Sequence, residues 1–388
     1  MRIGITTFGG DGGHSGISRY IIQLIREFAK MKENEFEVVV YEDEKDIFIP
    51  PGATNIHALV YPASLRSTSR NLMWHQQALP KLCAERKWDV LFLPAGNRRL
   101  PYRSPCPTVG TVHDFSSLHV KGKYDRAHMV YIQHILPALC RRLDRVITIS
   151  EASKQDILTH ARVPEEKITI IPHAADPAVY YPRDLDESHT KICKSLGLCK
   201  PYLLYVSRIE HPGKNHVRLI QAFAQLKAAG KLKDYQLVLA GKDWLGADAV
   251  HVEAEKCGYT DDVKFLGFVS DEDLPLLYAA ADIFLFPSLY EGFGLPVLEA
   301  MGMGVPVACA NASSLPEVMG DVATYFDPLN VEDIGRAIEK LLSDPAYRLD
   351  SVERGLARAK EFCWSKTAEA TMEVLRSAAS SPHAATHA

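Results

Sequence analysis

The chain contains 388 residues, which exceeds the roughly 250 to 300 residues at which a single hydrophobic core stops growing, so two domains are expected. Hydrophobic residues make up 47% of the sequence and charged residues 24%, the proportions of an ordinary soluble protein. The formal net charge of −4 gives the chain no bulk attraction to nucleic acid.

Short apolar strands alternate with helical patterns along the chain, which is typical of parallel sheets covered by helices on both faces. The first series opens with a strand at residues 3–8, and the helix after it places five apolar residues on one face: Ile17, Ile21, Leu24, Ile25 and Phe28. Further strands are predicted at 38–41, 89–94, 109–112 and 168–172. We therefore predict a doubly wound α/β domain over residues 1–185.

The segment 182–200 is charged and weakly periodic, and we place the connection between the domains there. A second doubly wound domain is predicted over residues 186–365, with strands at 202–207, 236–241, 263–268, 283–287 and 305–310. We expect a C-terminal helix at 366–378 that crosses back to the first domain, and a disordered tail at 379–388. Because ligands bind beyond the carboxyl ends of open parallel sheets, two such domains face to face would enclose one cleft.

Two carboxylates frame the run E-G-F-G-L-P-V-L-E, which follows an apolar strand. Pro296 suits the first position of a helix, and the free backbone N–H groups of a first helical turn attract an anion. Glu291 and Glu299 are better suited to accept hydrogen bonds from hydroxyl groups than to face a phosphate, although capping of the helix start by Glu299 is compatible with that role. Gly292 and Gly294 indicate unusual dihedral angles or close approach of a ligand. A nucleotide sugar offers both the phosphate and the hydroxyl groups.

Two cations flank the end of the strand at 202–207. Arg208 follows the strand directly, and Lys214 follows in the loop E-H-P-G-K-N before a helix. Fixed guanidinium and ammonium groups stabilise the negative charge of a departing nucleoside diphosphate. A surface arginine and a lysine at a helix start are the alternative, but the position at a strand end favours function.

The glycine-rich loop at residues 9–16 follows the first strand and opens the first helix. It is similar to a phosphate-binding loop, yet its spacing fits neither G-x-G-x-x-G nor G-x-x-x-x-G-K-[ST]. Two interpretations stay open: a flexible edge of the cleft, and a tight turn that lets the helix pack on the sheet.

The strand at 109–112 delivers His113 to its carboxyl end, where an imidazole can hydrogen-bond a sugar hydroxyl or transfer a proton, although a lone histidine is more often structural. His173 is a weaker candidate of the same kind. The acids at 271–273 have the D-x-D spelling of metal-dependent sugar transferases, but Ser270 precedes them as a helix cap, so we assign them to a helix start. The cysteines and histidines lack metal-site spacing, and no metal is expected.

The chain is locally basic between Arg66 and Arg145, with 14 Lys and Arg residues against five Asp and Glu. A solvated basic face and contact with an anionic membrane are both open. Eight cysteines include no C-x-x-C pair, and we expect reduced core thiols. The N-terminus enters a strand without a signal peptide, and no apolar run approaches the roughly 18 residues that span a bilayer. We expect a cytoplasmic location.

Together these features resemble the retaining nucleotide-sugar glycosyltransferases of the GT-B architecture in glycosyltransferase family 4, over nearly the whole chain. The most specific element is E-G-F-G-L-P-V-L-E, which is similar to the family's E-x7-E motif. It is supported by S-R followed by G-K-N, by S-D-E-D-L-P-L-L-Y-A-A-A-D and by S-G-I-S-R-Y near the N-terminus. The resemblance implies two Rossmann-like doubly wound domains that face each other across a deep cleft, the first binding the acceptor and the second the donor.

The resemblance also implies roles for the residues of the second domain. Arg208 and Lys214 would hold the diphosphate, Glu299 would accept hydrogen bonds from the ribose, and Glu291 would meet hydroxyls of the transferred sugar. The donor loop would comprise Gly292, Phe293, Gly294 and Leu295, with backbone N–H groups of the last three facing the ligand. The strand end at Phe268 and Val269 would meet the nucleobase.

In the first domain, His113 resembles the family's cleft histidine near the donor sugar. Gly12 and Gly13 resemble its mobile loop near the donor phosphate and the acceptor. The family often has Asn-Gly where this chain has His173-Ala174, so that position stays outside the predicted site.

The activity implied by the resemblance is metal-independent transfer of a hexose from a nucleoside diphosphate sugar to a hydroxyl of a glycan or lipid-linked glycan, with retention at the anomeric carbon. Resemblance to envelope and O-antigen mannosyltransferases favours GDP-mannose as the donor, followed by UDP-glucose or another UDP-hexose. No cofactor is implied, and the basic first domain favours an acceptor at the inner membrane surface. The alternatives are a GT-B sugar-nucleotide 2-epimerase and a noncatalytic nucleotide-sugar sensor.

Overall fold

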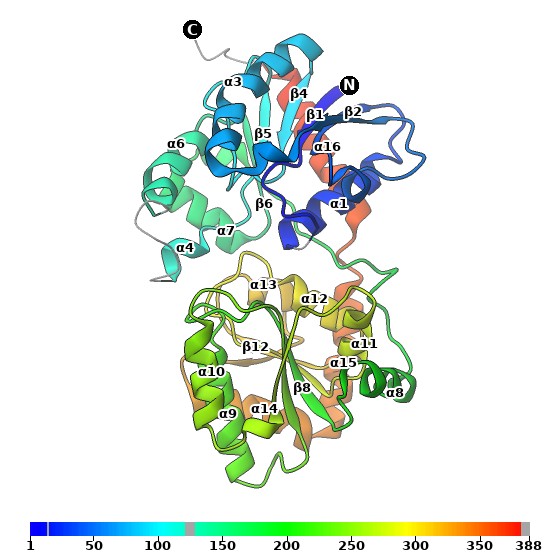
Figure 1. Ribbon diagram of the computed structural model, residues 1–388, viewed down its shortest axis with the longest axis vertical. Coiled ribbons are helices and arrows are strands. Elements are labelled where there is room, and N and C mark those ends of the chain that lie inside the picture. The colour runs from blue at the N-terminus through cyan, green and yellow to red at the C-terminus, as the bar shows by residue number, and fades with distance from the viewer. Residues whose placement is uncertain (14, 121–128, 382–388) are drawn as a thin grey trace. The chain divides into compact units, whose positions relative to one another are not determined.

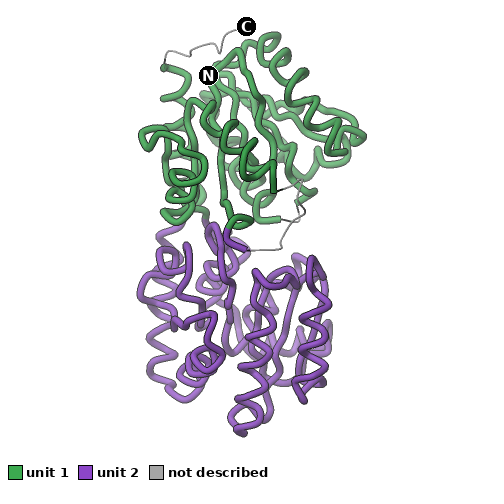
Figure 2. Tube along the Cα trace, turned by 90° about the vertical axis from the view of Figure 1, so that its left-hand side faces the viewer, with its two compact units in different colours: residues 1–118, 124–173, 363–388 green, residues 119–123, 174–362 purple. Residues whose placement is uncertain are grey.

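The computed structural model describes residues 1–13, 15–120 and 129–381. The chain divides into two compact units (Figures 1 and 2). Unit 1 holds the described residues within 1–118, 124–173 and 363–388, and unit 2 holds those within 119–123 and 174–362.

Unit 1 is built on a seven-stranded parallel sheet in the order β3-β2-β1-β4-β5-β6-β7. Its strands are β1 (Arg2–Thr6), β2 (Glu35–Tyr41), β3 (Ile56–Tyr61), β4 (Val90–Leu93), β5 (Thr108–Thr111), β6 (Arg145–Thr148) and β7 (Ile168–Ile170). Every residue of β4 and β5 is buried, and β4 is a continuous apolar run, as expected of a parallel sheet that helices cover on both faces. The sequence analysis did not identify β3 and β6.

The α-helices described before residue 174 are α1 (Gly16–Phe28), α2 (Lys45–Phe48), α3 (Thr68–Arg86), α4 (Ser116–His119), α6 (Leu136–Cys140) and α7 (Glu151–Asp156). Helix α1 begins after Ser15, whose side chain accepts a hydrogen bond from the backbone of Ser18. Its predicted apolar face packs on the sheet: four of the five predicted residues, Ile21, Leu24, Ile25 and Phe28, are fully buried.

Unit 2 contains a six-stranded parallel sheet in the order β10-β9-β8-β11-β12-β13. The strands are β8 (Tyr202–Val206), β9 (Gln236–Ala240), β10 (Val263–Gly267), β11 (Ile283–Phe286), β12 (Val307–Ala310) and β13 (Thr324–Phe326). The helices are α8 (Leu185–Leu196), α9 (His216–Ala228), α10 (Ala247–Lys256), α11 (Asp273–Ala279), α12 (Leu295–Gly302), α13 (Leu315–Met319), α14 (Val331–Ser343) and α15 (Pro345–Ala359). The strand order reverses between β8 and β11, which is the point where doubly wound sheets bind their ligands.

The chain leaves unit 1 earlier than predicted, between His173 and Ala174 rather than near residue 185. The charged segment that we took as the connection contains α8, which packs on α11 inside unit 2. The last helix, α16 (Trp364–Ser380), belongs to unit 1, where it packs on α1 and on β4, β5 and β6. Its last turn includes residues assigned above to the tail, and residues 382–388 lie outside the described part of the chain.

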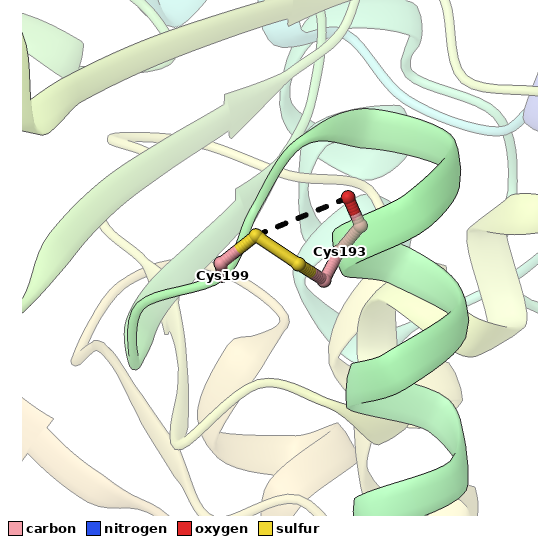
Figure 3. Close-up of a disulfide and its surroundings, with 2 residues drawn as sticks. All are labelled: Cys193 and Cys199. Atoms are coloured by element: carbon pink, nitrogen blue, oxygen red, sulfur yellow. Dashed lines mark hydrogen bonds between the residues drawn. A yellow bond between two sulfur atoms is a disulfide. The ribbon is translucent and has the colours of Figure 1, made fainter.

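The expectation of eight reduced thiols is wrong at one pair, because Cys193 and Cys199 form a disulfide (Figure 3). Gly197 ends α8 in the left-handed conformation, with φ of 70°, and turns the chain back toward β8. This turn brings the two Cα atoms to 4.6 Å, within the range for a disulfide. Cys83, Cys106, Cys140 and Cys309 are buried thiols outside the disulfide, as predicted.

Candidate functional site

The loops after β8 and β11 bring together an oppositely charged pair at the carboxyl end of the unit 2 sheet. Nζ of Lys214 lies 2.6 Å from Oε1 of Glu291, and the two side chains are only 16% and 15% exposed. The residues are 77 positions apart in sequence, but β8 and β11 are neighbours in the sheet. Two residues of the predicted site therefore meet at the switch point.

The main chain around Lys214 is fixed from three sides. Asn215 immediately precedes α9 and has φ of 59°. Its side-chain amide donates hydrogen bonds to the carbonyl oxygens of Pro287 and Pro328. The Tyr205 hydroxyl donates to the Lys214 carbonyl oxygen at 2.9 Å. The loop is thus held against the carboxyl ends of β11 and β13, and the side chain of Lys214 extends from a fixed main chain.

The loop that carries Glu291 is fixed by two serines that follow β12. The Glu291 backbone N–H donates to Ser313, and the buried Ser314 hydroxyl lies 3.0 Å from the carbonyl oxygens of both Glu291 and Phe293. Gly294 has φ of 101°, and a Cβ there would lie 2.8 Å from Leu315. Glycine is therefore required at this position both for its dihedral angles and for the space.

Arg208 lies half-exposed beside two residues that the sequence analysis missed. Its guanidinium lies 3.2 Å from the carboxylate of Glu210, whose side chain is 2% exposed, and 5.0 Å from the ring centre of Trp244. A carboxylate and an aromatic face together restrict where an arginine can point. Trp244 is in the loop after β9 and belongs to no motif. For Glu210, the only signal in the sequence is its position two residues after Arg208.

The second carboxylate of the E-x7-E run, Glu299, is buried in the first turns of α12. It is 5% exposed, and its Oε2 accepts a hydrogen bond from the Tyr278 hydroxyl at 2.8 Å. Helix α12 begins at Leu295 with Pro296 in its first turn, as predicted. Phe293 is buried and packs edge-on against Phe362, so the side chain faces the protein and leaves only its backbone for a ligand.

The strand end predicted to meet a nucleobase carries an exposed aromatic ring. Phe268 is 54% exposed, and the Lys242 ammonium lies 4.9 Å from its ring centre. Val269 follows and is half-buried. Close by in sequence, Ser270 caps the start of α11 by accepting a hydrogen bond from Asp273, which confirms that the D-x-D acids lie at a helix start.

The predicted residues of unit 1 lie at the carboxyl ends of β1 and β5. His113 is 3% exposed, and its Nε2 donates to the Pro94 carbonyl oxygen at 2.8 Å. Burial lowers the pKa of His113 to about 4, so the ring is neutral at pH 7 and does not act as an imidazolium acid. His173 is buried and stacks on Tyr20 at 4.6 Å, which gives it a packing role.

The glycine-rich loop after β1 closes on itself at the start of α1. Gly12 and Gly13 have φ of 68° and 92°, and Oδ1 of Asp11 accepts hydrogen bonds from the Ser15 backbone and the Ser18 hydroxyl. This carboxylate occupies the positive end of α1, which a phosphate would otherwise occupy. His14 lies outside the described residues.

None of the described helices is long and apolar enough to cross a membrane.

Both halves of the chain match known protein families. Residues 194–358 match the family described as glycosyl transferases group 1, and residues 14–179 match glycosyltransferase family 4. The O-antigen chain mannosyltransferase B of Escherichia coli is 35% identical over 93% of this chain and 96% of its own length. The serotype-specific mannosyltransferase WbdA of the same species is 33% identical over 69% of this chain but only 33% of its own length.

The same fold occurs in solved structures. The crystal structure of Anabaena HepE in complex with UDP and glucose covers 97% of this chain and 100% of the HepE chain, with a TM-score of 0.75 and 21% identity. This similarity shows the GT-B fold of two Rossmann-like domains. With the family matches, it follows that this chain belongs to glycosyltransferase family 4 and is a glycosyltransferase.

Proposed function

We propose that the protein transfers mannose from GDP-mannose to a hydroxyl of a glycan or lipid-linked glycan, with retention at the anomeric carbon and without a metal ion. Mannose is favoured by the 35% identity to the O-antigen chain mannosyltransferase B, which extends over nearly the whole of both chains. A UDP-hexose is the next candidate donor, since HepE was solved with UDP and glucose.

The observation that carries this proposal is the Lys214–Glu291 pair at the switch point of unit 2. An ammonium group has three N–H donors, and Glu291 uses one of them, so Lys214 can still bind diphosphate oxygens. Glu291 in turn has free acceptor capacity for hydroxyl groups of the sugar. A cation and an anion in contact, at the carboxyl ends of two neighbouring strands, suit a ligand that joins a diphosphate to a polyol.

In this proposal the bond between the anomeric carbon and the diphosphate oxygen breaks, and the electron pair leaves with the diphosphate. Lys214 and Arg208 stabilise the developing negative charge. The acceptor hydroxyl attacks on the same face, and its proton passes to the departing phosphate oxygen. His113, neutral and held by Pro94, orients a sugar hydroxyl and transfers no proton.

The first test is a thermal-shift panel with GDP-, UDP-, dTDP- and ADP-sugars, because a ligand that binds only the folded protein raises the melting temperature. GDP-mannose should give the largest shift. Incubation with the donor alone then separates the alternatives: slow hydrolysis, with nucleotide release that depends on an acceptor, is expected of a transferase. Isomerised nucleotide sugar would indicate an epimerase, and binding without turnover on any acceptor would indicate a sensor.

Peripheral contact of unit 1 with an anionic membrane forms part of the proposal, on the strength of the basic surplus between Arg66 and Arg145. Binding to vesicles that contain phosphatidylglycerol should fall steeply as salt rises. Absent or salt-insensitive binding would refute the proposed membrane contact but would not affect the proposed transferase activity.

A further inference from the structure

Two residues after Arg208, the chain places a carboxylate in the interior of unit 2. The Glu210 side chain is 2% exposed, and its Oε2 lies 3.2 Å from Nη2 of Arg208, whose own side chain is 45% exposed. A buried carboxylate costs free energy unless it is paired, and Arg208 provides such a partner. Because Glu210 is shielded almost completely, its effect on a bound donor would be indirect, through the residues beside it.

The main chain of Glu210 is fixed by an extension of the sheet beyond β8 and β9. Ile209 pairs in parallel with Asp243, and it forms backbone hydrogen bonds to the chain on both sides of Asp243. The same register places Glu210 next to Trp244, and residues two positions apart on a strand share one face. Arg208, Glu210 and Trp244 therefore lie on one face of this extension, which agrees with the 5.0 Å between the Arg208 guanidinium and the centre of the Trp244 ring.

The other oxygen of this carboxylate faces the loop that carries Lys214. A Cβ atom at Gly213 would lie 2.9 Å from Oε1 of Glu210, which is closer than Cβ atoms pack. Glycine at this position thus leaves the room that the carboxylate needs. Glu210 therefore lies between the two segments that bear the cations of the candidate site, Arg208 on one side and the turn before Lys214 on the other.

This arrangement matters because the guanidinium of Arg208 is half-exposed. A long exposed side chain has many rotamers, and a ligand that must fix it loses binding free energy. Here Glu210 holds the guanidinium on one side, and the Trp244 ring restricts it on the other, before any donor binds. A cation that is already oriented stabilises the charge that develops in a transition state without reorganising.

The negative charge of Glu210 has the opposite effect on binding of the donor in its ground state. A carboxylate beside Arg208 repels a diphosphate and offsets part of the charge that attracts it. If attraction of the diphosphate were the only requirement, an uncharged side chain would serve better at this position. The carboxylate therefore favours a role in orienting Arg208 over a role in attracting the donor.

We infer that Glu210 is a positioning residue of the transfer reaction: it holds the guanidinium of Arg208 where the diphosphate departs, and Gly213 leaves the space for it to do so. The inference rests on the proposed function, and it adds a residue that acts on the reaction only through another side chain. Changes at Glu210 should accordingly alter the chemical step only while Arg208 is present.

The test is a double-mutant cycle on the chemical step. Glu210→Gln keeps the size of the side chain but removes its charge, whereas Gly213→Ala keeps the charge but displaces the carboxylate. Both changes are made in the unchanged protein and in Arg208→Gln. Single-turnover transfer from GDP-mannose to an alkyl mannoside is measured with the protein in excess, so that slow release of GDP does not affect the rate. The Kd of GDP and the melting temperature are measured for every variant.

We expect Arg208→Gln to lower the single-turnover rate about a hundredfold, and Glu210→Gln and Gly213→Ala to lower it about tenfold each. In the Arg208→Gln background, neither change should lower the rate further. The Kd of GDP should not rise in Glu210→Gln, because the charge of Arg208 remains. Equal losses in both backgrounds would show that Glu210 acts independently of Arg208 and would overturn the inference. An unchanged rate with tighter binding of GDP would also overturn it, since Glu210 would then only oppose the diphosphate.

Asp282→Asn is the matched control. Asp282 lies 3.6 Å from Arg348 in the same unit, with both side chains partly buried, but it directly precedes β11 and so lies at the amino end of the sheet. This variant should transfer mannose at the rate of the unchanged protein, and a loss of about tenfold in it would overturn the inference. If the unchanged protein released no GDP from GDP-mannose with or without the acceptor, the proposed function itself would be refuted, and the inference with it.

Discussion

Replacement of Lys214 by alanine separates a catalytic role of the Lys214–Glu291 pair from a structural one. The pair is short, 2.6 Å, and both side chains are about 15% exposed, so the carboxylate left behind would be mostly shielded from water. A hydrogen bond between charged groups contributes about 1.5–3 kcal/mol, and we expect Lys214→Ala to lower the free energy of unfolding by about that amount. In a unit of this size, this corresponds to a fall in melting temperature of roughly 3 to 12 °C.

The expected effect on catalysis is larger than this loss of stability can explain. A fixed group that stabilises charge in the transition state is worth about a hundredfold in kcat, and the folded fraction of Lys214→Ala should remain near unity at 25 °C. We therefore expect kcat/KM for GDP-mannose to fall by tens of fold to about a hundredfold, measured as acceptor-dependent GDP release.

Lys231→Ala is the matched control, since Lys231 pairs with Glu339 at 2.5 Å in the same unit but with both side chains more than 40% exposed. Such a pair is worth about 1 kcal/mol or less, and this variant should keep both its stability and its activity. A Lys214→Ala protein that retains kcat/KM within about threefold of the unchanged protein would refute the role assigned to the ammonium group.

Three further predictions follow from other contacts. Tyr278→Phe removes the hydroxyl that donates to Glu299. This variant should raise the KM for GDP-mannose about three- to tenfold and lower the free energy of unfolding by about 1–3 kcal/mol. If both values were unchanged, the proposed role of Glu299 in donor binding would be contradicted. Burial lowers the pKa of His75, His113 and His216 to about 4, 4 and 3, whereas the unfolded chain takes up protons near pH 6.5. The free energy of unfolding should thus be highest above pH 6.5 and fall as the pH decreases toward 4, by about 1.4 kcal/mol per histidine and pH unit. Equal midpoints of urea unfolding at pH 7.5 and pH 5.5 would contradict this expectation. Cys199→Ser opens a disulfide across a separation of six residues and should cost about 2 kcal/mol under oxidising conditions and nothing in reductant, whereas equal losses in both would point to packing.

The fold was predictable in the strands that are apolar runs, but not in β6, which is largely buried and yet begins with Arg145 and ends with Thr148. Central strands such as β4 and β8 read as continuous apolar runs, and their alternation with helices indicates a parallel sheet. Strand β3 lies at an edge and mixes exposed with half-buried residues, and β13 has only three residues, so neither produces such a run. The C-terminal helix that we expected to cross back to the first domain corresponds to α16, which lies in unit 1, although its own periodicity does not specify which apolar surface it covers.

The candidate site was predictable in its motifs but not in its contacts. The positions of Lys214 and Glu291 after strands predicted that they share one edge of a sheet, and the adjacency of β8 and β11 places them in contact. Trp244 and Glu210, which surround Arg208, belong to no motif, because an aromatic face or a buried carboxylate can be supplied from many positions. The disulfide was missed for a similar reason: it depends on the turn at Gly197 rather than on cysteine spacing.

The most direct test of the central claim is a crystal structure of the protein with GDP-mannose. The account predicts that diphosphate oxygens lie within hydrogen-bond distance of Lys214 and Arg208, that Glu299 accepts hydrogen bonds from the ribose, and that Glu291 contacts hydroxyls of mannose. A donor bound with its diphosphate away from the carboxyl ends of β8 and β11 would contradict it.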